Sequence, residues 1–393
     1  MLPHFFGASV FVYIILLIYG ATQGAIRFQM DVIGWLFLAF YSMYLIGCIT
    51  TRHWDVASRT LEYKASFVLF PVLYAFKPRE GKLQLSIVVS GMIIALVVTT
   101  LYGLVNSFIC YYSGGGKQCF LTVIVSPVHH PTYFVVYWIT SIIAAWYGKF
   151  QNWKNYRLVW IIPFTILGII IHVLSLSLAG ILFLMLVVFV AMIYFIYKRF
   201  GKWISILTAC MLPIIGFLII TKTPQIEGEW NGAKWYADQY LKDPQGFIRN
   251  TTYPMSGSEE RLILWTVSTN SFVSHPMGVG TGNLEQTIHE ALVNIGQEEL
   301  AEKNLNPHNQ FLQTGLEVGI FGILLLIVIF IYSVFKGIKT SNPILIVIAS
   351  GLVFNSLFES MLQRQSGVVF FTLMLCFLAS PILGKGNVEK PSN

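Results

Sequence analysis

The chain has 393 residues, of which 55% are hydrophobic, 15% aromatic and only 11% charged, with a net charge of +7. A mean hydropathy of +0.68 excludes a water-soluble globular protein. The apolar residues form continuous runs near the thickness of a bilayer, not short alternating strands, so a transmembrane β-barrel is excluded too. We therefore expect an all-α polytopic membrane protein in the lipid bilayer, with no nucleic-acid partner.

Ten apolar runs have the length of about 17 to 25 residues that a membrane-spanning helix needs. They are residues 5–21, 32–50, 83–109, 131–148, 158–175, 179–197, 203–221, 310–335, 343–360 and 366–384. The first has no basic residue before it and is expected to be a signal anchor, not a cleaved signal peptide. A further segment, Ala65–Phe76, is shorter and contains Pro71, so it is compatible with crossing, re-entering or lying at the interface. The expected total is about 10 to 12 transmembrane helices.

Basic residues favour a topology in which Ala65–Phe76 does not cross, because Lys and Arg accumulate on the cytoplasmic side. Both termini then lie inside, and six basic residues share the cytoplasmic face with those of later loops: Arg52, Arg59, Lys64, Lys77, Arg79 and Lys82. If the segment crosses, these six divide three and three and the N-terminus lies outside. The first topology is preferred and the second is kept as the alternative.

Residues 222–309 form the one long polar segment, with eleven acidic and six basic side chains. Its charge of about −5, against about +12 for the rest, predicts a non-cytoplasmic loop. The chain is thus divided into an N-terminal transmembrane bundle (1–221), a large periplasmic loop with short helices (222–309) and C-terminal transmembrane helices (310–393). Cys110 and Cys119 bracket a short loop on the same outer face, where a disulfide and two free thiols are equally compatible with the sequence.

The most informative segment begins at Asn306-Pro307-His308-Asn309. Asn306 is a suitable N-cap and Pro307 a suitable first helical residue, which would place His308 in the first turn of a transmembrane helix at the outer surface. An imidazole there, beside a polar loop, titrates near neutrality and is a candidate general base.

Asn309, Gln313 and Glu317 recur every four residues and predict a polar stripe down this helix. A carboxyl group at that depth is costly, so it should face protein or a water-filled cavity. Gly315, Gly319 and Gly322 would let a neighbouring helix approach and cover it. Interhelical hydrogen bonding and substrate binding are equally good interpretations of Gln313 and Glu317.

Upstream, Ser258 as N-cap with two glutamates behind it predicts a helix that carries Arg261 and, four residues on, Trp265. A guanidinium binds phosphate oxygens in two-pronged fashion. The following His275-Pro-Met-Gly-Val-Gly-Thr-Gly-Asn283 is compatible with an anion-binding nest or, more commonly, a tight turn. Neither GxxxxGK[ST] nor GxGxxG between strand and helix is present, so no nucleotide cofactor is expected.

Together these motifs resemble the signature of the O-antigen ligase and O-antigen polymerase superfamily of bacterial membrane glycosyltransferases. The resemblance rests on His308-Asn309 followed by Gly319 and Gly322, on Arg261-Leu-Ile-Leu-Trp265 with His275–Gly280, and on Phe354–Ser360 running into Gly367. It covers about the last third of the chain. It implies a GT-C-like architecture in the bacterial inner membrane, with the active site on the periplasmic side.

The resemblance implies that a glycan is transferred from undecaprenyl diphosphate, with His308 deprotonating the acceptor and Arg261 binding the diphosphate. No metal or other cofactor is implied, and Glu227-Gly228-Glu229 is interpreted as a solubilising loop segment. Lipid A core as acceptor would make the protein an O-antigen ligase, which the His-Asn-Gly-Gly spacing favours. Another lipid-linked repeat unit would make it a polymerase, and a protein hydroxyl an O-oligosaccharyltransferase.

One departure from the family pattern concerns the diphosphate site, because Leu178 stands where a further arginine is expected. The candidates to replace it are Arg364, Arg249, Lys222 and the adjacent His129 and His130. The competing function of another class is a transporter or flippase of lipid-linked sugars, with Glu317 and Arg364 as charges along a pathway. No internal symmetry is visible in the sequence to support it.

Overall fold

The computed structural model describes residues 3–78, 85–211, 234–251 and 255–380. These residues are almost entirely helical, and the expected all-α polytopic architecture is confirmed. Five of the described helices are long and apolar enough to cross a membrane, and shorter apolar helices lie beside them. The predicted span at 203–221 is described only as far as a helix over Lys202–Met211.

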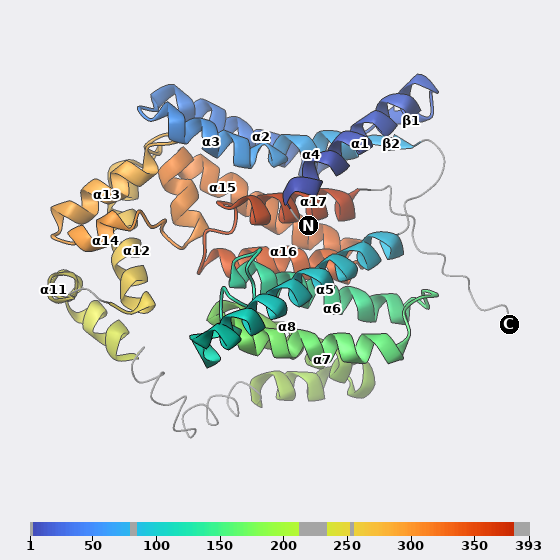
Figure 1. Cartoon of the computed structure of the whole chain (residues 1–393). Coiled ribbons are helices and arrows are strands. Elements are labelled where there is room, and N and C mark those ends of the chain that lie inside the picture. Colours follow the sequence, from blue (N-terminus) through green and yellow to red (C-terminus); the bar gives the residue numbers. More distant parts are fainter. Residues whose placement is uncertain (1–2, 79–84, 212–233, 252–254, 381–393) are drawn as a thin grey trace.

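The helices form three layers (Figure 1). The middle layer consists of α15 (Gln310–Lys339), α16 (Pro343–Ser356) and α17 (Gln365–Ala379). One side is covered by α2 (Val32–Gly47), α3 (Trp54–Lys64) and α4 (Ser66–Ala75), and the other by α5 (Leu85–Cys110), α6 (Pro131–Phe150), α7 (Leu158–Ser175) and α8 (Leu178–Phe200). The N-terminal α1 (Pro3–Thr22) leads into a two-stranded sheet of β1 (Ile26–Phe28) and β2 (Phe76–Pro78), paired antiparallel.

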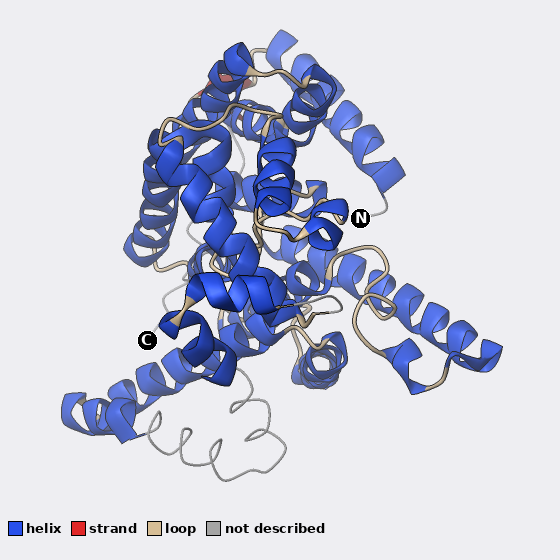
Figure 2. Ribbon diagram, turned by 90° about the vertical axis from the view of Figure 1, so that its left-hand side faces the viewer, coloured by secondary structure: helices blue, strands red, loops and turns tan. Residues whose placement is uncertain are grey.

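A smaller group of helices lies across one end of these layers (Figure 1), the end that faces the viewer in Figure 2. It comprises a helix at residues 234–242, α11 (Pro244–Asn250), α12 (Gly257–Ser274), α13 (Leu284–Asn294) and α14 (Glu298–Glu302). Its own apolar core includes Ile263, Leu264 and Ile288, and Leu316 of α15 belongs to the same cluster. The polar segment therefore folds as short helices that are joined to the membrane bundle through α15.

Two residues mark the two ends of the bundle: His308, just before α15, and Lys336, in the last turn of α15. The His308 end carries α11–α14. The Lys336 end carries the sheet, because Lys336 Nζ lies 3.2 Å from Asp31 Oδ2 and the Gln29 N–H donates to the Ala75 carbonyl.

Helices α3 and α4 run one after the other from the His308 end to the Lys336 end, which disagrees with the preferred topology, because the Arg52 N–H, just before α3, donates to Oδ1 of Asn283, just before α13. Lys64, just before α4, donates to the carbonyl of Leu362, whereas Ala75 at the other end of α4 lies beside β1. The preferred count failed because it treated Lys64 as a loop charge, although this side chain is buried. The alternative, in which the segment crosses, fits the structure, and Pro71 is accommodated within the helix.

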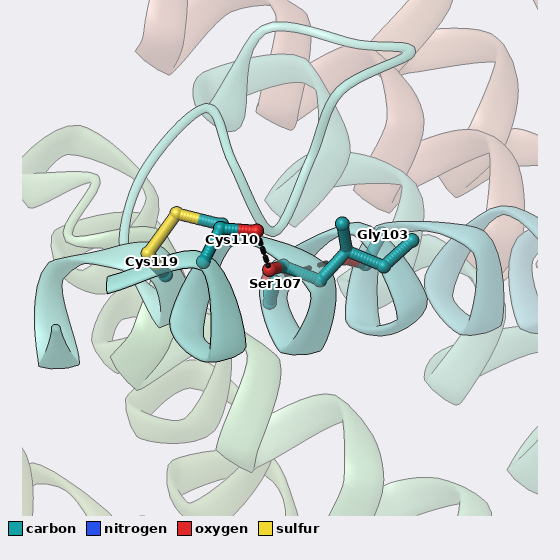
Figure 3. Close-up of a disulfide and its surroundings, with 6 residues drawn as sticks. Gly103, Ser107, Cys110 and Cys119 are labelled. Atoms are coloured by element: carbon teal, nitrogen blue, oxygen red, sulfur yellow. Dashed lines mark hydrogen bonds between the residues drawn. A yellow bond between two sulfur atoms is a disulfide. The ribbon is translucent and has the colours of Figure 1, made fainter. Parts of the chain in front are cut away.

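Cys110 and Cys119 form a disulfide, with Cα atoms 5.7 Å apart, which settles the question left open by the sequence. The bond closes the turn after α5, one turn beyond Ser107, whose hydroxyl donates to the Gly103 carbonyl (Figure 3). Gly103 packs directly against the Val125 carbonyl of the following loop. The disulfide thus fixes the connection that leads toward α6.

Helix α15 is interrupted at Gly319, where φ is 76° and ψ is −173°. The segment 276–279 fills the interruption: the Ile320 N–H donates to the Pro276 carbonyl and the Val279 N–H to the Leu316 carbonyl. Gly315 contacts Phe272 of α12, as expected for a close helix approach, but Gly319 faces the backbone of Met277. The glycines of 275–283 therefore serve close backbone packing instead of an anion nest.

Candidate functional site

His308 lies immediately before α15 and not in its first turn, which corrects the expected helix start. Asn309 is the N-cap, and its side-chain oxygen accepts from the N–H groups of Phe311 and Leu312. Asn306 instead accepts a hydrogen bond from the His308 N–H at 2.9 Å. His308 has a φ of 47°, a conformation unusual for a residue with a Cβ.

The imidazole of His308 contacts Glu359, a residue to which the sequence assigned no role. Nδ1 lies 3.1 Å from Oε2 and 3.3 Å from Oε1 of the carboxylate. Glu359 follows α16, in the turn of residues 357–364 that leads to α17, and is only 5% exposed. The sequence held two signals for it, a carboxylate at the end of the apolar run 343–360 and its place inside the motif Phe354–Ser360.

The charge of Glu359 is stabilised by its surroundings. Burial by itself raises the pKa of this carboxyl group. The hydrogen bond and positive charge of His308, the charge of His130 and the Ser360 N–H all lower it, and together they hold the pKa of Glu359 below its ordinary value. The pair therefore joins an imidazole to a carboxylate that stays ionised near neutral pH.

Basic side chains from two further elements, Arg261 and Arg364, interact electrostatically with His130, which in turn interacts with this pair. Burial lowers the pKa of His130, the N-cap residue of α6. The negative charge of Glu359 raises this pKa, whereas the positive charges of Arg364, His308 and Arg261 lower it further. Arg364 precedes α17 and Arg261 lies in the second turn of α12. The structure thus brings four predicted residues, His308, Arg261, Arg364 and His130, into one electrostatic neighbourhood.

Helix α12 begins at a capping box formed by Ser256 and Glu259, two residues earlier than expected. Ser258 is therefore inside the helix and not its N-cap. The cap fixes the first turn and, with it, the position of Arg261. Arg261 is partly buried, and Trp265 lies one turn further along.

Several buried polar atoms at this end have no hydrogen-bond partner among the residues that the structure describes. They include Nδ1 of His130, Nε1 of Trp265 and Oγ of Ser360. Buried polar groups in proteins are normally paired, so unpaired ones call for an explanation.

The other predicted residues are placed differently. Gln313 and Glu317 are buried; Gln313 Nε2 donates to Glu317 Oε1 at 2.9 Å, and Lys64 Nζ lies 3.8 Å from Glu317 Oε2. Asn309 Nδ2 donates to the Leu357 carbonyl, in the turn that carries Glu359. Within the described residues these contacts match the interhelical interpretation of the polar stripe.

The remaining candidate cations are Arg249 and Lys222. Arg249 is exposed near the end of α11, where the neighbouring carbonyls of Ile248 and Thr251 accept from Gln297. Lys222 and the Glu227-Gly228-Glu229 segment lie outside the described residues. An apolar cavity of about 440 Å³ between α5, α6 and α7 is lined by none of the predicted site residues.

Comparison with known proteins agrees with the motifs. Residues 163–327 match the family model described as O-Antigen ligase. The resemblance to the O-antigen ligase superfamily is thereby confirmed. The matched region contains Arg261 and His308, whereas Glu359 and Arg364 lie beyond it and His130 before it.

Two relatives are similar to this chain, and the name of the second agrees with the same superfamily. An uncharacterized protein of Haemophilus influenzae is 27% identical over 210 residues, which is 49% of this chain and 49% of that protein. A Rickettsia prowazekii protein named "Putative polysaccharide ligase" is 29% identical over 106 residues, 25% of this chain and 26% of that protein. The chain thus aligns with about half or less of these relatives. The family match and the apolar helices support a multi-pass membrane protein.

Proposed function

We propose that this protein is an O-antigen ligase that transfers a glycan from undecaprenyl diphosphate to lipid A core on the periplasmic side of the inner membrane. The observation that carries the proposal is the His308–Glu359 contact, at 3.1 Å, within a neighbourhood of Arg261, Arg364 and His130. A base beside fixed cations is what transfer from a diphosphate leaving group requires. The match to the family model supports the reaction class.

In the proposed reaction, the acceptor hydroxyl gives its proton to Nε2 of His308, the ring nitrogen that does not face Glu359. The acceptor oxygen bonds to the anomeric carbon as the bond from that carbon to the diphosphate oxygen breaks. Glu359 accepts a hydrogen bond from the Nδ1–H and stabilises the imidazolium. Arg261 and Arg364 balance the charge of the departing diphosphate, and His130, kept neutral, donates one hydrogen bond to it.

The three divisions of the chain fit this reaction. Residues 310–393 supply Glu359 and Arg364, residues 222–309 supply His308 and Arg261, and residues 1–221 supply His130. Asn309, Gln313 and Glu317 hold α15 and the Glu359 turn in place instead of touching the glycan.

The test uses purified full-length protein with a defined undecaprenyl-diphosphate-linked glycan and lipid A core. His308→Ala should lower the transfer rate by about 10² to 10⁴, the usual contribution of a general base. His289→Ala, which removes an imidazole on α13 that contacts the Ala301 carbonyl, is the matched control and should stay near wild type. Full activity of His308→Ala would overturn the mechanism.

The same preparation separates the alternatives. Lipid-linked repeat units or a protein hydroxyl offered in place of lipid A core test the polymerase and the O-oligosaccharyltransferase. Transfer that persists in excess chelator is expected, because no step uses a metal. Movement of intact donor across liposomes without any product would identify a flippase and refute the glycosyltransferase.

A further inference from the structure

The turn that carries Glu359 is held by its backbone at Leu362. The Leu362 N–H donates to Oε1 of Gln310 at 2.6 Å, and the Leu362 carbonyl accepts from Nζ of Lys64 at 3.0 Å. The side chains of Gln310 and Lys64 are both buried. Leu362 lies between Glu359 and Arg364, so its position affects both of these residues.

Lys64 makes more than this one contact. Its ammonium group also donates to Oε1 of Gln363 at 3.1 Å, lies 3.8 Å from Oε2 of Glu317, and stands 4.5 Å from the centre of the Tyr44 ring. A buried ammonium needs such compensation because removal from water is costly. Lys64 therefore connects α3, α15 and the Glu359 turn through one charge.

A second ion pair at the opposite end of α15 provides a comparison. Lys336 Nζ lies 3.2 Å from Asp31 Oδ2 and also joins α15 to the N-terminal part of the chain. This pair is partly exposed, and in the described residues it contacts neither the Glu359 turn nor His308. Both are therefore lysine–carboxylate pairs that involve α15, but only the Lys64 pair contacts the Glu359 turn.

We propose that Lys64 is a positioning residue for glycan transfer: by holding the Leu362 carbonyl and Gln363 against buried Glu317, it keeps Glu359 in contact with His308. The proposal rests on the proposed function, since it assigns Lys64 a role in that reaction. Lys64 touches no reacting atom and acts through the turn of residues 357–364.

The test compares charge-balanced variants. Lys64→Met/Glu317→Gln removes the ammonium without leaving a buried carboxylate unpaired, and Lys336→Met/Asp31→Asn is the matched control. The first should lower kcat at least about tenfold, with the donor KM changed less than about twofold, while the control stays near wild type. The pH–rate profile of the first variant should resemble that of Glu359→Gln.

A combined variant tests whether Lys64 acts through Glu359, because the effects of mutations at residues that act through a shared partner are not additive. If Lys64 works through Glu359, adding Lys64→Met/Glu317→Gln to Glu359→Gln should cause no further loss. A full additional loss in the combined variant, or an unchanged kcat in Lys64→Met/Glu317→Gln, overturns the proposal. If that variant is not recovered folded, Lys64→Gln/Glu317→Gln, which keeps polar groups at both positions, replaces it with the same criteria.

Hydrogen exchange distinguishes this proposal from the proposed function. In Lys64→Met/Glu317→Gln, amide exchange over residues 357–364 should rise at least about tenfold while exchange over 340–342, the turn at the Lys336 end, stays unchanged. If wild-type protein transfers no glycan, the proposed function fails, and unchanged exchange over 357–364 would separately overturn the positioning role of Lys64.

Discussion

Glu359 keeps a negative charge in a nearly closed environment because His308 and the Ser360 N–H offset the cost of burial. The carboxylate in turn orients the imidazole, because Nδ1 faces Glu359 and Nε2 is left on the other side of the ring. The protonation of Glu359 therefore links stability to pH at the residue on which the proposed chemistry depends.

Replacing Glu359 by Gln should lower the free energy of unfolding by about 1 to 3 kcal/mol at pH 7, the range for losing a charged hydrogen bond. The pKa of Glu359 is lowered below its ordinary value of 4.5. The stabilisation is therefore fully present above pH 4.5 and is lost as the pH falls through the lowered value. Thermal midpoints of wild type and Glu359→Gln should converge below pH 4.5.

The matched control is Glu285→Gln, which removes an exposed carboxylate at the start of α13. Its thermal midpoint should follow that of wild type over the whole pH range. If the thermal midpoints of wild type and Glu359→Gln still differ as much below the lowered pKa of Glu359, the stabilising charge has been assigned to the wrong residue.

His308 and Arg261 could be selected from the sequence because each stands in a local pattern with a recognisable helix start. Glu359 could not, because its partner is 51 residues away and only the packing of α15 against α16 brings the two together. Lys64 was misassigned for the same reason: charge counting assumes exposed loop residues, whereas this ammonium is buried against Glu317.

Among the elements, α15 is interrupted at Gly319, and this interruption requires glycine. A Cβ there would stand 2.5 Å from the backbone of Met277, and the positive φ is strained for any other residue. The sequence predicted close packing at Gly315 and Gly319, but only the structure shows that a loop, not a helix, enters at Gly319.

Gly319→Ala should lower the free energy of unfolding by at least about 1 to 3 kcal/mol, the cost of a strained backbone, before the clash is counted. Gly91→Ala in α5 is the control, since a Cβ there meets open space and helix propensity favours alanine. Thermal unfolding in detergent measures both. Equal stability of Gly319→Ala and wild type would contradict the interruption.

The Cys110–Cys119 disulfide stabilises the turn after α5 by limiting the unfolded chain. Replacing both by Ser should lower the free energy of unfolding by about 2 to 3 kcal/mol. Cys210→Ser, which removes an exposed free thiol, should have little effect on the thermal midpoint. Of the five cysteines, three should react with an alkylating agent in unfolded, unreduced protein, and reaction of all five would contradict the bond.

For the whole molecule, the start of α3 lies at the His308 end, together with α11–α14, because the Arg52 N–H donates to Oδ1 of Asn283. Ser58, exposed on α3, should therefore face the periplasm in the proposed orientation, and Lys154, exposed between α6 and α7, the cytoplasm. In a Cys210→Ser background, a membrane-impermeant maleimide should label Ser58→Cys in intact spheroplasts, but Lys154→Cys only after permeabilisation. Labelling of both positions from the same side would restore the topology without a crossing.

The sequence by itself determined the all-α membrane class, the positions of most spans and the motif residues His308 and Arg261. These properties depend on hydropathy and helix signals within about twenty neighbouring residues, which are local in the chain. Tertiary structure alone decided the crossing of α4, the interruption of α15, and the meeting of His308 with Glu359 and of Lys64 with Leu362. Each of these depends on contacts between residues tens to hundreds of positions apart, whose burial changes the cost of a charge in a way that no local pattern records.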